Sequence, residues 1–249
     1  MEKETIIFLH GIVGNRNAFK REMEVLQAHY HCISYDLYDP KLEGQFSLEQ
    51  LIEQLYRIYT KAKINRAHLC SLSFGCIIAK GFARKYPEMV LSMTFVGGYC
   101  CKVPSLFDQK LTKVLAIKDR YEYVEWIKLY ARLFNPNIPF IAEDSAAIFL
   151  NYALQVHPLA LEKAIFLQRE FDSSAALVTM KMPILWVMGE WDELYKSTLR
   201  DLSQFIPHVH YIELKNAGHV AHIHQPEPFM AIFQSFLNYS FIKHSDTAV

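Results

Sequence analysis

The sequence predicts an α/β protein whose core is a doubly wound, mostly parallel sheet of about six strands, with a helical cap inserted into it. Short apolar runs rich in β-branched residues alternate with longer stretches of helical periodicity. Strands that are apolar nearly throughout are typical of parallel sheets covered on both faces. Right-handed connections between such strands place helices on the two faces. One long central segment breaks the alternation and predicts the cap.

Six runs have the length and composition of buried strands. They comprise residues 5–9, 31–35, 67–70, 91–96, 184–188 and 208–214. Helical patterns lie between these runs and close the chain, over residues 18–28, 48–61, 76–86, 196–205 and 228–242. Alternation of this kind favours a parallel sheet in which helices connect successive strands.

Residues 101–180 have helical periodicity, are rich in aromatic residues, and are interrupted by Pro136, Pro139 and Pro158. We expect this segment to be a helical cap, or lid, inserted into a core made of residues 1–100 and 181–249. Ligands of open α/β sheets bind at the carboxyl edge of the strands. The cap is therefore expected to lie over that edge.

The composition excludes several classes of function. The chain has 249 residues, 51% of them apolar, and a formal net charge of zero, so it has no basic footprint for nucleic acid or for an anionic membrane. No stretch approaches the roughly 18 consecutive apolar residues that a membrane span requires. The N-terminus lacks the features of a secretory signal. None of these features predicts the oligomeric state.

The five cysteines (Cys32, Cys70, Cys76, Cys100 and Cys101) form an odd set without zinc-type spacing. Three of them lie on apolar strand or helix faces, which indicates reduced, buried thiols in a cytoplasmic protein. Cys100 and Cys101 fall in a predicted loop. Two structural thiols are the favoured interpretation there, and a redox pair is the alternative.

Ser73 lies where the apolar run of residues 67–70 changes abruptly into a helical pattern. A serine at such a strand-to-helix turn is raised above the sheet with its hydroxyl exposed, and small residues are needed two positions before and after it. Ser71 and Gly75 meet this need. A serine also occurs at ordinary turns, so its assignment as a nucleophile depends on partners elsewhere in the chain.

Asp192 and His219 follow the fifth and sixth predicted strands, at the same edge of the sheet as Ser73. A serine hydroxyl needs an imidazole to accept its proton and a buried carboxylate to fix the imidazole tautomer. Each residue alone has a structural explanation, such as a helix cap for Asp192. Together, in the order Ser, Asp, His, they favour a catalytic triad. Glu190 and Glu193 compete for the acid role, and Asp192 is preferred because of its offset from the glycine at the strand end.

Glycines after the first predicted strand, within residues 8–15, let backbone N–H groups turn toward the nucleophile. The N–H groups of Ile12 and of Phe74, the residue after the nucleophile, form the predicted oxyanion hole. His10, next to Gly11, is interpreted as a support of this loop rather than as a second base.

His219, His222 and His224 form a His-x-x-His-x-His run, which is also a pattern of metal sites. Zinc sites of this kind usually recruit further histidine or acidic ligands, and the sequence places no such cluster here. We therefore predict one catalytic histidine in a loop, with no metal and no cofactor.

These motifs resemble those of the α/β-hydrolase superfamily, in its capped, cofactor-free branch. The resemblance rests on His-Gly-x-x-Gly at residues 10–14, Ser-x-Ser-x-Gly at 71–75, Gly-Glu-x-Asp at 189–192, Gly-His at 218–219 and Gln-Pro-Glu at 225–227. The chain departs from the pattern in three respects. Ser71 and Cys76 replace glycines of the nucleophile elbow, which is the strand-to-helix turn around Ser73. The segment after Asp36 lacks a glycine-rich loop, and the usual hairpin before the first strand is missing.

The expected activity is hydrolysis of a carboxylic ester with a small or medium acyl group through an acyl-enzyme. Basic residues within 102–132 support an alternative, a thioesterase or carrier-linked methyl-ester esterase with an acyl carrier or coenzyme A as partner. A solvated helix face explains the same charges. The superfamily also includes cofactor-free lyases of the menaquinone-pathway type and weakly catalytic ligand receptors, and this third class remains open.

Overall fold

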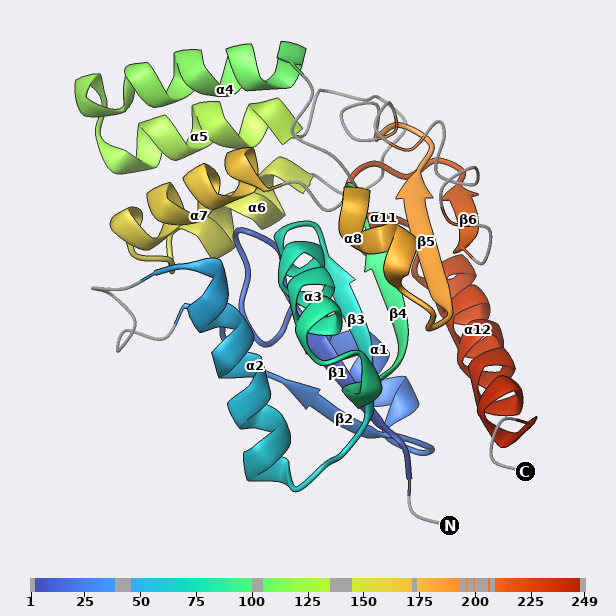
Figure 1. Cartoon of the computed structure of the whole chain (residues 1–249). Helices are drawn as coiled ribbons and strands as arrows, with labels where there is room; N and C mark the ends of the chain where they lie inside the picture. Colours follow the sequence, from blue (N-terminus) through green and yellow to red (C-terminus); the bar gives the residue numbers. More distant parts are fainter. Residues whose placement is uncertain are drawn as a thin grey trace.

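The computed structural model describes residues 3–38, 46–99, 105–134, 145–171, 174–192, 196, 199, 206 and 209–246. In this described part, a six-stranded sheet has the order β2-β1-β3-β4-β5-β6, and every neighbouring pair is parallel (Figure 1). The strands are β1 (Thr5–Leu9), β2 (His31–Ser34), β3 (Ala67–Leu72), β4 (Val90–Val96), β5 (Ile184–Gly189) and β6 (Val209–Leu214). The predicted parallel sheet of about six strands is confirmed.

The strand order reverses at β1, which pairs with β2 on one side and with β3 on the other. Ligands of doubly wound sheets bind at the carboxyl ends of the strands beside such a reversal. The register pairs Leu9 with Ser71 and Leu72 with Val96. The loops that leave β1, β3 and β4 therefore begin close together at one edge.

Helices cover both faces of the sheet (Figure 1). One face is packed by α2 (Leu48–Ala62) and α3 (Phe74–Lys85), and the other by α1 (Lys20–Leu26) and α12 (Pro226–Asp246). Successive side chains of a strand point to opposite faces, so β1 contributes to both cores and is buried along its whole length. This double burial explains why the central strands are apolar throughout.

Between β4 and β5, the described residues form helices and no strand. These are α4 (Ser105–Ala116), α5 (Tyr123–Phe134), α6 (Ser145–Ala153), α7 (Pro158–Glu170) and α8 (Ser174–Thr179). Figure 1 shows α4, α5, α6 and α7 together beyond the end of the sheet to which the arrow of β5 points. Both α7 and α8 also contact α3. We call α4 to α8 the helical segment.

Lys80 on α3 connects the sheet to the helical segment. Its buried ammonium group donates to the carbonyl of Tyr99 and lies 5.4 Å from the ring centre of Phe171, the residue after α7. The rings of Phe95 and Trp186 lie 5.8 and 5.7 Å from the same group. A desolvated cation over aromatic faces is stabilising, so this lysine helps to hold α7 against α3.

Short helices complete the described part: two 3-10 turns at Pro87–Met89 and Lys118–Arg120, and α11 at Ala221–His224. Cys70 and Cys76 are free, buried thiols, and Cys32 is half-buried. Outside the described residues lie Cys100, Cys101 and, except for Lys196 and Leu199, the helix predicted over residues 196–205. None of the helices in the described ranges combines the length and the apolarity needed to cross a membrane.

The boundary between β3 and α3 is sharper than the sequence pattern predicted. β3 continues to Leu72 and α3 begins at Phe74, so Ser73 alone makes the turn between them. Leu72 and Phe74 are apolar and fit either a turn or a buried element, which is why the pattern did not resolve this boundary.

Candidate active site

The backbone at Ser73 is held in a conformation that non-glycine residues rarely adopt, with φ 48° and ψ −110°. Its N–H donates to the carbonyl of Val96 at 2.9 Å, which ties the turn to the end of β4. A Cβ atom on Gly75 would lie 2.6 Å from the carbonyl oxygen of Leu9 and 2.7 Å from that of His10. Glycine is therefore required there for α3 to approach the end of β1, as the elbow motif predicted.

Ser71 is the other serine of the elbow, and its hydroxyl is occupied within the sheet. The residue is fully buried, and its Oγ donates to the carbonyl of Thr94 at 3.2 Å. Cys76 lies beside it, with 3.4 Å between the Ser71 Oγ and the Cys76 Sγ, and burial raises the pKa of the Cys76 thiol to about 11. The two residues that replace elbow glycines thus contact each other and fill the interior.

Asp192 and His219 meet across the loops that follow β5 and β6. The Asp192 Oδ2 lies 2.8 Å from the His219 Nδ1, and both side chains are largely buried. The two loops touch closely, because a Cβ atom on Gly189 would lie 2.2 Å from the carbonyl oxygen of Gly218. The contact between Asp192 and His219 orients the imidazole and favours the tautomer with a proton on Nδ1.

Gly97 brings His219 close to the elbow. This glycine has φ +57°, and a Cβ atom on it would lie 2.6 Å from the His219 carbonyl oxygen and 2.9 Å from its Nδ1. Gly97 directly follows Val96, whose carbonyl accepts the Ser73 N–H. The structure thus gathers the three predicted triad residues around the carboxyl ends of β3 to β6.

Glu190 has a different place from Asp192. Its Oε2 accepts the N–H of Asn216 at 3.0 Å, and Asn216 has a positive φ of 53° in the loop before His219. Glu190 therefore braces the histidine loop through its backbone, whereas Asp192 contacts the imidazole itself. Glu193, the other carboxylate considered from the sequence, lies outside the described residues.

The predicted oxyanion loop lies against Ser73. A Cβ atom on Gly11 would lie 3.7 Å from the Ser73 Cβ and 3.4 Å from the Leu72 side chain. Phe74 is buried as the first residue of α3, so its N–H lies at a helix N-terminus, where partial positive charge gathers. The candidate donors Ile12 and Phe74 thus belong to the two segments that flank the serine.

His10 connects the oxyanion loop to the segment after β2. Its Nε2 lies 3.0 Å from the backbone N of Leu37 and accepts that N–H, so the ring proton must be on Nδ1. The Nδ1 lies 2.8 Å from the carbonyl oxygen of Gly11 and donates to it. Burial lowers the pKa of His10 to about 4. His10 is thus a neutral residue with both nitrogens engaged, which supports its interpretation as a loop support.

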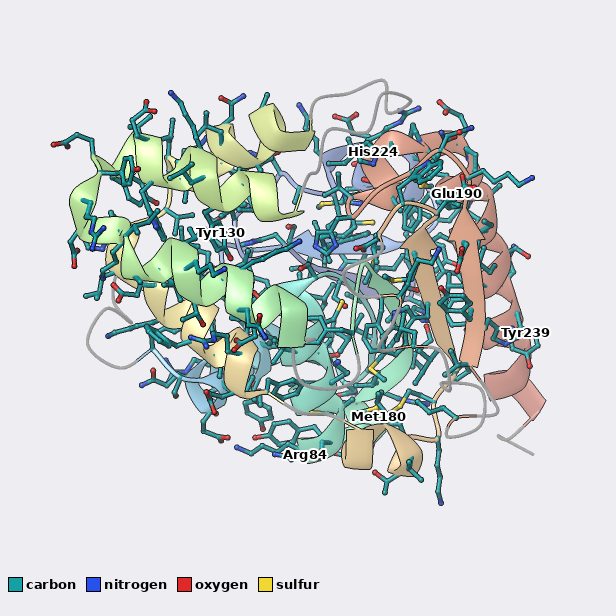
Figure 2. The ribbon with its side chains drawn as sticks, turned by 90° about the horizontal axis from the view of Figure 1, so that it is seen from above. Arg84, Tyr130, Met180, Glu190, His224 and Tyr239 are labelled. Carbon is teal, nitrogen blue, oxygen red and sulfur yellow. The ribbon has the colours of Figure 1, made fainter. Side chains whose placement is uncertain are left out.

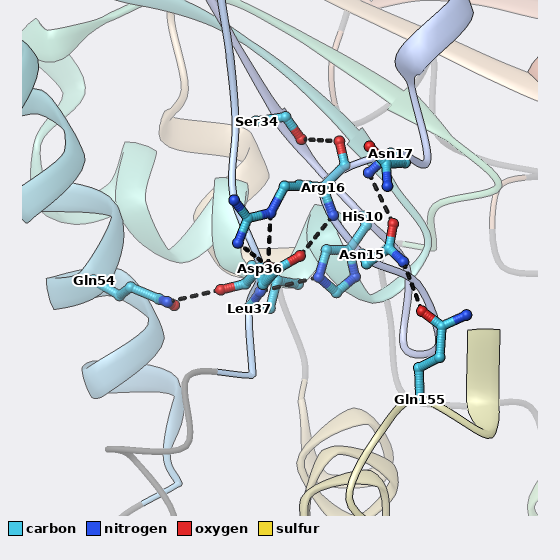
Figure 3. A network of polar contacts seen from close by, with 9 residues as sticks. All are labelled: His10, Asn15, Arg16, Asn17, Ser34, Asp36, Leu37, Gln54 and Gln155. Atoms are coloured by element: carbon cyan, nitrogen blue, oxygen red, sulfur yellow. Dashed lines mark hydrogen bonds and ion pairs between the residues drawn. The ribbon is translucent and has the colours of Figure 1, made fainter.

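Sequence reasoning missed the network that joins this loop to the end of β2 (Figure 3). Asp36 accepts the backbone N–H of Arg16 at 2.7 Å and its Nε–H at 2.8 Å, and the Gln54 side chain donates to the Asp36 carbonyl. The Arg16 guanidinium holds the pKa of the Asp36 carboxyl below its usual range, against the opposing effect of burial. The sequence signal that could have indicated this network was Asp36, an acidic residue directly after the strand predicted over residues 31–35.

The other two histidines of the His-x-x-His-x-His run serve the packing. His222 is buried, stacks on Phe19 with 4.7 Å between ring centres, and has its pKa lowered to about 3 by burial. The Nδ1 of His224 accepts the N–H of Gly218 at 3.0 Å. No group of three or more potential metal ligands gathers among the described residues. Figure 2 shows His224 and Glu190 on the β5–β6 side, and Tyr130 among the helices of the helical segment.

The sequence matches known proteins at the level of a family. Residues 6–232 match the profile of the alpha/beta hydrolase family. The fold and the elbow motif agree with that match. The chain belongs to the alpha/beta hydrolase family and is an enzyme of that family.

Individual similar proteins are distant in sequence. A pimeloyl-[acyl-carrier protein] methyl ester esterase of Aeromonas salmonicida is 26% identical over 93% of this chain and 94% of its own. A protein of Bacillus subtilis, named provisionally as 2-succinyl-6-hydroxy-2,4-cyclohexadiene-1-carboxylate synthase, is 22% identical over 94% of this chain and 90% of its own. The crystal structure of a hydrolase from Pseudomonas aeruginosa superposes with a TM-score of 0.81 at 20% identity, covering 94% of this chain and 90% of that one.

Proposed function

We propose that the protein is a serine hydrolase that cleaves a carboxylic ester of a small or medium acyl group through an acyl-enzyme. The observation that carries the proposal is the buried contact of 2.8 Å between Asp192 and His219 beside the strained turn at Ser73. A neutral hydroxyl is a weak nucleophile unless a base is held ready to take its proton. The same three residue types in the same chain order serve acyl transfer in this fold.

In the proposed reaction, the Ser73 Oγ attacks the ester carbonyl carbon while His219 Nε2 takes the hydroxyl proton. Asp192 stabilises the imidazolium that forms, and the N–H groups of Ile12 and Phe74 receive the negative charge on the carbonyl oxygen. The C–O bond to the alcohol then breaks, and His219 returns the proton to the leaving alcohol. Water repeats the sequence on the acyl-enzyme and releases the acid. The reaction requires no metal and no cofactor.

We propose further that the cap comprises residues 101–180, the core comprises residues 1–100 and 181–249, and the cap encloses the acyl group. Buried apolar residues of the helical segment, among them Leu111, Ile127 and Tyr130, belong to the same core cluster as Ile12 and Val13 of the oxyanion loop. Enclosure by apolar side chains suits an acyl chain and excludes water. The buried, free thiols of Cys70 and Cys76 support a cytoplasmic location.

Labelling with a fluorophosphonate and hydrolysis of short p-nitrophenyl esters test the proposal. We expect Ser73 to be labelled, and Ser73→Ala to lower kcat by about 10⁴-fold or more. Ser71→Ala is the matched control, because its hydroxyl contacts the sheet interior, and it should keep most of the activity. More than a tenth of the activity left in Ser73→Ala would place the nucleophile elsewhere.

The similarity to the Aeromonas esterase supports a second candidate, an esterase acting on a carrier-linked methyl ester or a thioester. It would require basic residues free to receive an anionic carrier. In the stretch from α4 to α7, Lys118 pairs with Glu162 at 2.5 Å and Lys128 with Glu125 at 2.6 Å. These pairs partly neutralise the basic residues within 102–132. We therefore rank the plain ester first.

The Bacillus relative supports a third candidate, synthesis of 2-succinyl-6-hydroxy-2,4-cyclohexadiene-1-carboxylate. The same imidazole and N–H donors can accept a proton and stabilise an oxyanion without an acyl-enzyme. Assaying the formation of that product distinguishes the candidates. Product formation without turnover of any ester would replace the esterase proposal.

A further inference from the structure

The segment after β2 lacks the glycine-rich loop expected from the family resemblance, and an aromatic residue stands there instead. The Tyr38 hydroxyl donates to the carbonyl of Ile12 in the oxyanion loop. Its ring lies 5.7 Å from that of His10 and stacks on Phe46, with 5.8 Å between ring centres. The Tyr38 ring thus packs between the rings of His10 and Phe46, and its hydroxyl binds the oxyanion loop.

Two adjacent peptide groups of the loop are held by these side chains. The C=O and N–H of one trans peptide point in opposite directions. Because His10 binds the Gly11 carbonyl, the Ile12 N–H of the same peptide points away from His10. Tyr38 holds the next carbonyl, that of Ile12, and so fixes the plane that follows. Rotation of either plane would turn the Ile12 N–H.

We propose that Tyr38 is a positioning residue, which keeps the Ile12 N–H directed at the oxyanion by anchoring the Ile12–Val13 peptide. This inference rests on the proposed function, since it assigns a role within the same oxyanion hole. In the described part of the chain, Tyr38 contacts Ile12, His10 and Phe46, so we expect it to act through the backbone of the loop.

The helical segment supports this arrangement from a second side. Asn15 of the oxyanion loop donates to the Gln155 side chain at 3.1 Å, between α6 and α7 (Figure 3). The Tyr123 hydroxyl on α5 donates to the Ala153 carbonyl at 3.1 Å in the same turn. Burial, and secondarily the phenol of Tyr123, raise the pKa of Tyr38. The loop is therefore held at Ile12 by Tyr38, which follows β2, and at Asn15 by Gln155 of the helical segment.

Tyr38→Phe tests the proposal, because it removes only the hydroxyl. The matched control is Tyr59→Phe, which removes a buried hydroxyl that donates to the Met89 carbonyl at 3.2 Å, away from the site. We expect Tyr38→Phe to lower kcat for a p-nitrophenyl ester by about tenfold or more with KM within about twofold, since a misplacement of ~1 Å costs ~10² in rate. The rate of fluorophosphonate labelling should fall in parallel. Tyr59→Phe should change neither rate.

Hydrogen exchange of residues 8–15 provides a second readout, and we expect faster exchange there in Tyr38→Phe only. Equal kcat and equal labelling in Tyr38→Phe and wild type would overturn the positioning role while leaving the proposed function intact. Equal losses of activity in Tyr38→Phe and Tyr59→Phe would likewise overturn it, as a general effect of destabilisation. Failure of wild-type Ser73 to be labelled at all would instead overturn the proposed function, and this inference with it.

Discussion

The loops at the carboxyl edge of the sheet and the helical segment beyond them are held together by different kinds of interaction. In the loops, polar side chains bind backbone groups, as the buried His10 does to Gly11 and the half-buried Glu190 does to Asn216. In the helical segment, aromatic and aliphatic side chains fill the interior and ion pairs such as Lys118–Glu162 lie near the surface. Buried hydrogen bonds fix directions, whereas apolar contacts tolerate substitution of similar volume. If the proposed function holds, we expect the loops to determine the rate and the helical segment to determine which acyl group is accepted.

The largest expected effect concerns the two carboxylates after β5. Asp192→Asn should lower kcat by roughly 10³- to 10⁴-fold, because an amide favours the wrong imidazole tautomer. Glu190→Gln keeps an oxygen that can accept the Asn216 N–H and should cost less than about tenfold. Steady-state kinetics with one p-nitrophenyl ester compare them directly. A greater loss in Glu190→Gln would exchange the roles of the two residues.

The second prediction concerns the close contact between Gly97 and His219. Gly97→Ala should lower kcat by about 100-fold, since a Cβ atom there must displace the imidazole and a displacement of ~1 Å costs about that much. The control is Gly81→Ala in α3, where the nearest atoms to the added Cβ belong to the movable side chains of Ile52 and Leu48. That variant should retain its activity. Loss in both variants would mean that tight packing as such, rather than His219 placement, controls the rate.

The third prediction concerns a carboxyl group buried on α1. Burial raises the pKa of Glu22 from 4.5 to about 7, so its stabilising contribution is present below pH 4.5 and is lost as the pH rises through about 7. Glu22→Gln should therefore raise the free energy of unfolding by roughly 1–3 kcal/mol at pH 8 and by much less at pH 5. Thermal unfolding at the two pH values measures this difference. Glu24→Gln, on the exposed side of the same helix, should show no such pH dependence.

The buried histidines have the opposite pH dependence. The pKa values of His10 and His222 are lowered to about 4 and about 3, so the neutral forms stabilise the fold above pH 6.5. That contribution is lost as the pH falls from about 6.5 through those values. In Glu22→Gln, the loss of stability on acidification should remain. Its disappearance would contradict the histidine contribution, because the stabilising contribution of Glu22 grows on acidification and cannot account for the loss.

The smallest effect is expected in the helical segment. Lys110→Ala with Lys113→Ala, both exposed on α4, should change kcat and KM for a neutral ester by less than about twofold. The same should hold for a coenzyme A thioester if the plain ester is the substrate. A rise in KM confined to the coenzyme A substrate, and fading with added salt, would favour the carrier-linked alternative instead.

The main features of the fold were readable from the sequence because the strands are buried on both faces. Strands such as β1 and β5 are apolar over their whole length, and their bounds agree with the prediction to within a residue. The candidate site was indicated by Ser73, Asp192 and His219 following separate strands. Their roles in catalysis stay predictions, as does the division into core and cap.

The supporting contacts could not be predicted, because they join residues that are remote in sequence. Lys118 and Glu162 pair across 44 positions, and Asn15 and Gln155 across 140. Nothing in the local pattern indicates that Gly97 needs a positive φ, since the requirement arises from His219 on another loop. The role of Tyr38 likewise depends on β2 lying beside β1, which the order of strands along the chain does not reveal.

The position of β1 inside the sheet has a consequence for how the chain reaches its active form. β1 has its two neighbours, β2 and β3, within the first 72 residues, whereas His219 follows β6, the strand at the far edge. Contacts between residues distant in sequence form late, because closing a long stretch of chain costs entropy first. On the ribosome, half of the sheet can assemble well before His219 reaches Ser73. With the roles proposed for these two residues, we expect the nascent chain to stay catalytically silent until β6 and the loop after it have been made.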